Sequence, residues 1–145
     1  MNVACERILE SITRKVTRDN RKKFTDETRL NYIKSELENS DYEIMNTTDL
    51  AVIYKKKNVD LDENIVLIST HVDCVDAIHE PDFQITMKGN YKGTFDNAAT
   101  NAVAVISMLE NMFSDNVLIA FTGDEEETQN GAKQVIGYLE KENKK

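Results

Sequence analysis

Two short apolar runs, each the length of one β-strand, constrain the fold of this chain more than any other feature. Residues 65–70 read Ile-Val-Leu-Ile-Ser-Thr, and residues 117–121 read Val-Leu-Ile-Ala-Phe. Runs of this kind, without alternation, are typical of strands that are buried on both faces. Between them, residues 97–113 repeat apolar side chains at helical spacing. Two buried strands joined through a helix predict a parallel pair with a right-handed crossover.

The rest of the chain predicts helices and strands before and after this unit. Apolar spacing predicts a helix from Val3 to about Val16, a second from Thr25 or Asp26 onward, and a last one over 131–141. Further strands are expected at residues 42–46, 50–55 and 83–87. We therefore predict an α/β fold with three layers, αβα, around a mostly parallel mixed sheet. One domain would span residues 1–145, and ligands would bind beyond the carboxyl ends of its strands.

Composition excludes several classes of function. The 145 residues are 40% hydrophobic and 30% charged, with a net charge of −8. This acidity argues against nucleic-acid binding, which depends on clustered Lys and Arg. No apolar run reaches the roughly 18–20 residues that a membrane span requires, and the N-terminus does not resemble a signal peptide. Cys5 and Cys74 suggest no disulfide framework. We expect a cytoplasmic protein without a membrane partner.

A histidine and an aspartate follow the first apolar run. His71 and Asp73 are two residues apart, which places their side chains on the same side of an extended chain. A neutral imidazole is a common zinc ligand, and a nearby carboxylate can hold its N–H and so choose the nitrogen that faces the metal. A lone histidine after a strand is more often structural, so this pair alone leaves both interpretations open.

Carboxylates also occur at the start of the connecting helix and after the second run. Asp96 could simply cap that helix, or it could bridge two metal ions. Residues 124–127 are four consecutive acids, which could form a solvated loop. Adjacent carboxylates repel one another, and a divalent cation would supply the missing counter-charge. One Glu could then bind the ion while its neighbour accepts a proton from water.

Together these segments resemble the co-catalytic zinc exopeptidases, a superfamily of aminopeptidases, dipeptidases, carboxypeptidases and deacylases with a phosphorylase/hydrolase-like fold. The resemblance covers about residues 64–139. The matching stretches are Thr70–Asp73, Gly93–Asn97 and Phe121–Glu126, the last followed by Gly131 and Ala132.

The resemblance implies a role for each site residue. His71 would bind one metal ion, Asp96 would bridge two ions, and Glu126 would bind the second. Glu125 would be the general base, and Asp73 would orient the imidazole of His71. The implied cofactor is a pair of divalent ions, two zinc ions, with manganese or cobalt as alternatives.

The sequence also departs from the family pattern. Thr128 stands where the family usually has glycine, and the last two metal ligands of the family have no counterpart before Lys145. We therefore expect the N-terminal part of a metallopeptidase catalytic domain, a hydrolase of the aminopeptidase or dipeptidase type for peptides or N-acyl amino acids. The 145-residue chain itself is expected to be inactive or nearly so.

Two alternatives to a metallopeptidase fragment stay open. One is a short, degenerate protein that keeps the fold and serves as a binding module. The other is half of an enzyme whose missing ligands come from another chain. A truncated sheet would expose a strand edge, which favours a homo-oligomer.

Overall fold

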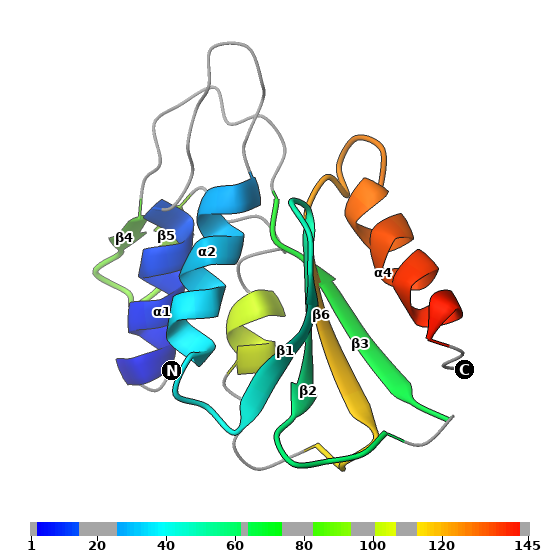
Figure 1. Ribbon diagram of the computed structural model, residues 1–145. Helices are drawn as coiled ribbons and strands as arrows, with labels where there is room; N and C mark the ends of the chain where they lie inside the picture. The colour runs from blue at the N-terminus through cyan, green and yellow to red at the C-terminus, as the bar shows by residue number, and fades with distance from the viewer. Residues whose placement is uncertain are drawn as a thin grey trace.

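The computed structural model describes residues 3–14, 26–61, 64–73, 83–93, 101–106 and 113–142. Its main sheet has four strands in the spatial order β1-β2-β6-β3, and β4 and β5 form a separate two-stranded sheet (Figure 1). The strands are β1 Tyr42–Thr47, β2 Ala51–Lys56, β3 Val66–His71, β4 Phe83–Ile85, β5 Tyr91–Gly93 and β6 Val117–Thr122. The helices are α1 Val3–Arg14, α2 Asp26–Leu37 and α4 Asn130–Lys141, and residues 101–106 are also helical.

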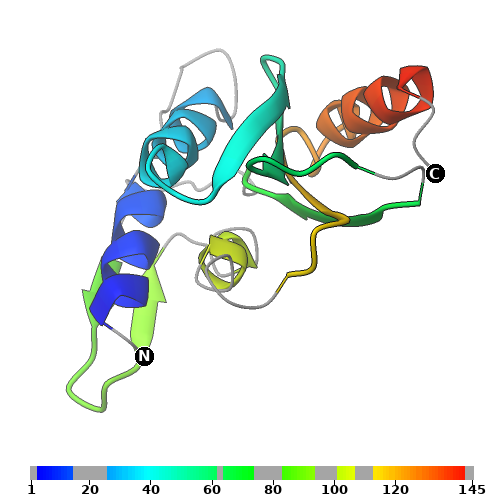
Figure 2. The same cartoon turned by 60° about the horizontal axis from the view of Figure 1, so that its bottom comes forward.

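Helices lie on both faces of the main sheet, which gives three layers. Helix α2 and the helical residues 101–106 lie on one face, α4 lies on the other, and α1 packs beside α2 (Figures 1 and 2). Two apolar cores match these layers. The larger core joins α1, α2 and residues 101–106 to the sheet, and the smaller one joins α4 to it. The predicted αβα arrangement is therefore confirmed.

Strand β6 forms the centre of the main sheet. All six of its residues are buried, because β2 and β3 pair with its two edges and helices cover both faces. Phe121 points into the larger core, whereas Leu118 and Ala120 point toward α4. The prediction of a doubly buried strand is confirmed here.

Strand β3 lies at the edge of the described sheet, and the prediction that it is buried on both faces is wrong. Val66 is 51% exposed and Leu67 is 36% exposed. Among the described strands only β6 pairs with β3, so nothing in the described chain covers its second edge. An apolar run indicates that a strand can be buried, but whether it is buried depends on the strands and helices that pack beside it.

The directions of the strands correct a second prediction. β3 and β6 run parallel, as expected from the helical connection, with an unbroken register from Val66 opposite Val117 to His71 opposite Thr122. The pairs β1–β2 and β2–β6 are antiparallel. The described sheet is therefore mixed, with one parallel pair out of three, and "mostly parallel" is wrong for it.

The remaining predicted elements differ in smaller ways. The strand expected at residues 83–87 is β4, which pairs with β5 away from the main sheet. The helix expected at residues 97–113 is present over 101–106, but Phe113, which is also described, is not helical. Within the described residues, no helix has the length and apolar character that crossing a membrane requires.

Candidate metal centre

The site begins where β3 and β6 end side by side. His71 is the last residue of β3 and lies opposite Thr122, the last residue of β6. The pairing continues one residue further, because the Val72 N–H donates to the Thr122 carbonyl at 2.8 Å. Strands β3 and β6 therefore end at the same level of the sheet. Asp73 follows β3 in a buried position, with 6% of its surface exposed.

The acidic run after β6 is a compact turn rather than an extended loop. Asp124 adopts a left-handed backbone conformation, with φ at 59°. Its carbonyl accepts hydrogen bonds from the N–H groups of Thr128 at 3.3 Å and Gln129 at 2.6 Å, and its carboxylate accepts one from the Thr128 hydroxyl. Aspartate tolerates this conformation better than most residues. The chain therefore turns back directly after β6, which brings Glu125 and Glu126 toward the end of β3.

Glycine at position 131 holds helix α4 against this turn. A Cβ atom on Gly131 would lie 2.4 Å from the Gly123 carbonyl oxygen and 2.6 Å from that of Leu50. Gly123 itself donates its N–H to the Leu50 carbonyl at 2.8 Å. The start of α4 is thus in backbone contact with both strand ends, and this contact fixes one end of the acidic turn.

His71, Glu125 and Glu126 form a cluster of potential metal ligands. Each offers one ligand atom, and these atoms lie within 4.8 Å of one another. The Nδ1 atom of His71 is 3.9 Å from Oε2 of Glu125. Zinc bonds of about 2.0–2.2 Å in a tetrahedral site require ligand atoms roughly 3.5 Å apart. Side-chain shifts of about 1 Å would therefore close the cluster on an ion.

Two buried polar atoms at the cluster lack hydrogen-bond partners within the described part of the chain. His71 Nδ1 and Asp73 Oδ1 are both buried and lie 3.4 Å apart, and neither has a hydrogen-bond partner among the described residues. The other oxygen of Asp73 accepts a hydrogen bond from the Glu126 N–H at 3.1 Å. Buried polar atoms without partners are uncommon and point to an ion, a water molecule or a functional role. The mixture of imidazole and carboxylate donors suits zinc, manganese or cobalt.

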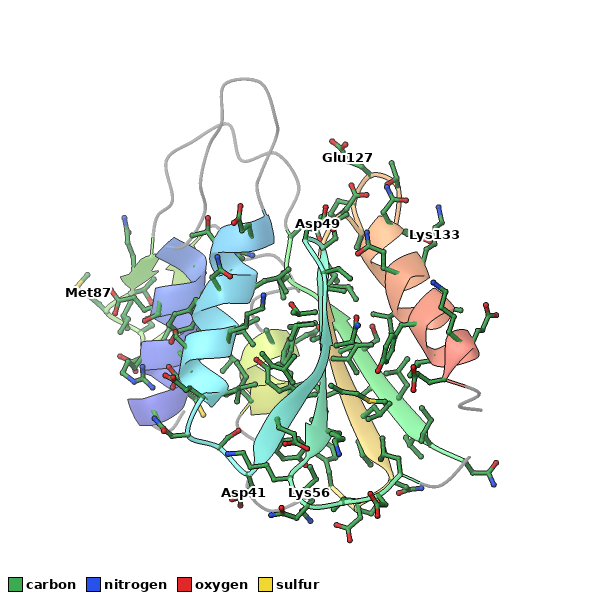
Figure 3. The ribbon with its side chains drawn as sticks, in the orientation of Figure 1. Asp41, Asp49, Lys56, Met87, Glu127 and Lys133 are labelled. Atoms are coloured by element: carbon green, nitrogen blue, oxygen red, sulfur yellow. The ribbon has the colours of Figure 1, made fainter. Side chains whose placement is uncertain are left out.

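The structure brings together four of the five predicted site residues. His71, Asp73, Glu125 and Glu126 come from two strand ends and share one site, whereas Asp96 lies outside the described residues. Cys74 also lies outside them. Glu127 continues the acidic run but stands at the tip of the turn and points outward (Figure 3).

Sequence reasoning missed one residue at this site, Arg29. It lies on α2 with 2% of its surface exposed, and its guanidinium donates to the Val72 carbonyl at 2.6 Å. The available signal was an arginine beside Leu30 and four residues before Ile33, on the face of α2 that the core buries.

Comparisons of the chain with protein-family models, with curated proteins and with solved structures found no match.

Proposed function

We propose that His71, Glu125 and Glu126 lie at a divalent-metal site, and that the chain supplies this site to a hydrolase of the co-catalytic zinc exopeptidase type. Its substrates would be peptides or N-acyl amino acids. The convergence of one imidazole and two carboxylates within 4.8 Å carries the proposal. Zinc is the first choice of ion, with manganese and cobalt as alternatives.

The proposed roles follow from burial and contact. When bound, a divalent ion supplies Lewis-acid chemistry, because it polarises a carbonyl group and makes water easier to deprotonate. His71 would hold one ion, and Glu126 would hold the second. The side chain of Glu125 is 42% exposed, so water and substrate can reach its carboxylate, which would accept the proton. Asp73 would orient His71, and its bond to the Glu126 N–H ties the two halves of the site together.

The proposal includes Asp96 as the carboxylate that bridges to a second ion. Its support is the resemblance of Gly93–Asn97 to the family motif, because residues 94–100 lie outside the described residues. In the described cluster, His71 and Glu126 would each give one ligand atom to an ion, and Glu125 would act as the base.

Zinc binding by the full chain tests the metal site directly. We expect isothermal titration calorimetry to detect binding that His71→Ala and Glu126→Gln each weaken at least about tenfold. Glu127→Gln is the matched control, since it removes the same charge from the same acidic run at a side chain that points outward. An equal loss of affinity in Glu127→Gln would show diffuse attraction to acidic residues and would contradict a defined site.

Hydrolysis tests the role of Glu125. His71 and Glu126 each offer one ligand atom, whereas a catalytic zinc ion normally has three protein ligands, so we expect the 145-residue chain to hydrolyse amino-acid amides slowly or not at all. Any rate should disappear with a chelator and with Glu125→Gln, while Glu125→Gln should bind zinc more tightly than Glu126→Gln does. A hydrolytic rate that survives either treatment would contradict the roles proposed for the metal and for Glu125.

A further inference from the structure

Arg29 is a buried cation whose position calls for an explanation. It lies on α2 and exposes 2% of its surface. Arginine is almost never fully buried unless its charge and its donors find partners, because removing a charge from water is costly. The exposed side of α2 would have accepted an arginine without this cost.

One contact of Arg29 reaches the centre of the candidate site. Its Nη1 atom donates a buried hydrogen bond of 2.6 Å to the carbonyl of Val72, which is 43 residues away in the sequence. Val72 stands between His71 and Asp73 and is itself fully buried. Because the Val72 N–H already donates to Thr122, the peptide groups on both sides of Val72 are held.

The held segment is the part of the site that lies beyond the sheet. β3 ends at His71, and no described strand pairs with the backbone after Val72. At this point the hydrogen bond from Arg29 to the Val72 carbonyl holds the peptide group that leads into Asp73. Asp73 then accepts the Glu126 N–H at 3.1 Å, which links the segment to the acidic turn.

We propose that Arg29 is a positioning residue of the metal site: it acts through the Val72 carbonyl to hold Asp73 where this carboxylate faces His71 and binds the Glu126 backbone. This inference rests on the proposed function for its consequence on metal binding. Its structural half, the control of the Asp73–Glu126 bond by Arg29, holds without any metal.

Amide hydrogen exchange of the metal-free full chain tests the structural half. The measured quantity is the exchange rate of the Glu126 amide divided by that of the Gly123 amide, which donates to Leu50 instead. We expect Arg29→Met to raise this ratio roughly three- to tenfold, since one hydrogen bond is weakened selectively. Arg29→Lys keeps the charge and one donor, so it should raise the ratio by a smaller factor, about twofold.

A matched control separates positioning from a general loss of stability. Thr13 is fully buried in α1, and its hydroxyl donates to Leu9 of the same helix at 2.7 Å. Thr13→Ala should therefore lower stability and leave the Glu126-to-Gly123 ratio unchanged. If Arg29→Met does not fold, Arg29→Lys carries the test. An unchanged ratio in a folded Arg29 variant overturns the proposal.

Zinc titration of the same variants tests the functional half. We expect the affinity for Zn²⁺ to fall at least about fivefold in Arg29→Met and to stay within about twofold in Thr13→Ala. A raised exchange ratio with unchanged zinc affinity overturns the claim that the site depends on Arg29. If the wild-type chain binds no zinc, the proposed function fails, and the exchange ratio still decides whether Arg29 positions Asp73.

Discussion

The two edges of the main sheet are built differently. At the β1 edge, the pairing with β2 contains an irregularity between Ile44 and Asn46, and Glu43 pairs with Lys55 at 3.1 Å. Bulges and charges of this kind keep an edge from pairing with another chain. At the β3 edge, residues 66–70 carry no charged side chain, and the register with β6 is unbroken. We call these the protected edge and the bare edge.

The geometry of the candidate site explains why the bare edge has a regular register. A regular register carries His71 to the same level as Thr122, from which the acidic turn begins two residues later. A bulge in β3 would turn alternate side chains to the other face and move His71 away from Glu125 and Glu126. The bare edge thus keeps the geometry that the site needs, and the protected edge carries none of the cluster residues.

The largest expected effect comes from breaking the contact that ties α4 to the β2 side of the sheet. Gly131→Ala places a Cβ 2.4 Å and 2.6 Å from two backbone carbonyl oxygens, which cannot move without shifting the strand ends. We expect a loss of about 3 kcal/mol or more in the free energy of unfolding, measured by urea denaturation.

Gly137→Ala is the matched control in the same helix, because its Cβ would meet no atom of the described residues within 4 Å. It should stabilise the protein by about 0.5–1 kcal/mol through helix propensity. Equal stability of the two variants would show that α4 does not depend on the close contact at Gly131.

A second, smaller effect concerns Tyr54 on β2, one strand in from the protected edge. Burial raises the pKa of its hydroxyl to about 12. The folded protein therefore keeps the proton that the unfolded chain releases near pH 10, so stability falls as pH rises from about 10 to about 12. The loss amounts to roughly 2–3 kcal/mol, since one pKa unit corresponds to about 1.4 kcal/mol.

Tyr54→Phe should remove this part of the alkaline loss. Its hydroxyl has no hydrogen-bond partner among the residues that the structure describes, so the variant should unfold like the wild type near neutral pH. Urea denaturation of both proteins at about pH 9 and about pH 11.5 makes the comparison. Parallel losses of stability in the two proteins would contradict the raised pKa of Tyr54.

The smallest expected effect tests the bare edge itself. We expect the chain to self-associate through β3, and Leu67→Lys to raise the dissociation constant at least about tenfold, or about 1.4 kcal/mol, in sedimentation equilibrium. Ile44→Lys is the matched control, because Ile44 is also an exposed apolar residue on an edge strand, at 45% against 36% for Leu67. If both substitutions raise the dissociation constant by the same factor, the two edges do not differ in the way proposed.

Much of the fold could be predicted because local spacing reports which faces of an element are apolar. Leu30, Ile33 and Leu37 of α2 are buried as their three- and four-residue spacing indicates. The apolar stretch Val117–Phe121 could be recognised as a central strand, and the ends of β3 and β6 could be recognised as the place where His71 meets the acidic run. The edge position of β3 could not be predicted, because it depends on which strands pair and not on the residues of β3 alone.

The sequence by itself therefore determined the order of the elements other than β5, their apolar faces, and the donor chemistry at the strand ends. Only the tertiary structure decided that Asp124 turns the acidic run back toward His71, that Gly131 sits against two strand ends, and that Arg29 holds Val72 from 43 residues away. The physical reason is the distance along the sequence over which each kind of interaction acts. Propensity and periodicity act between neighbours in the sequence, whereas a buried hydrogen bond or a close backbone contact joins residues that only the packed core brings together.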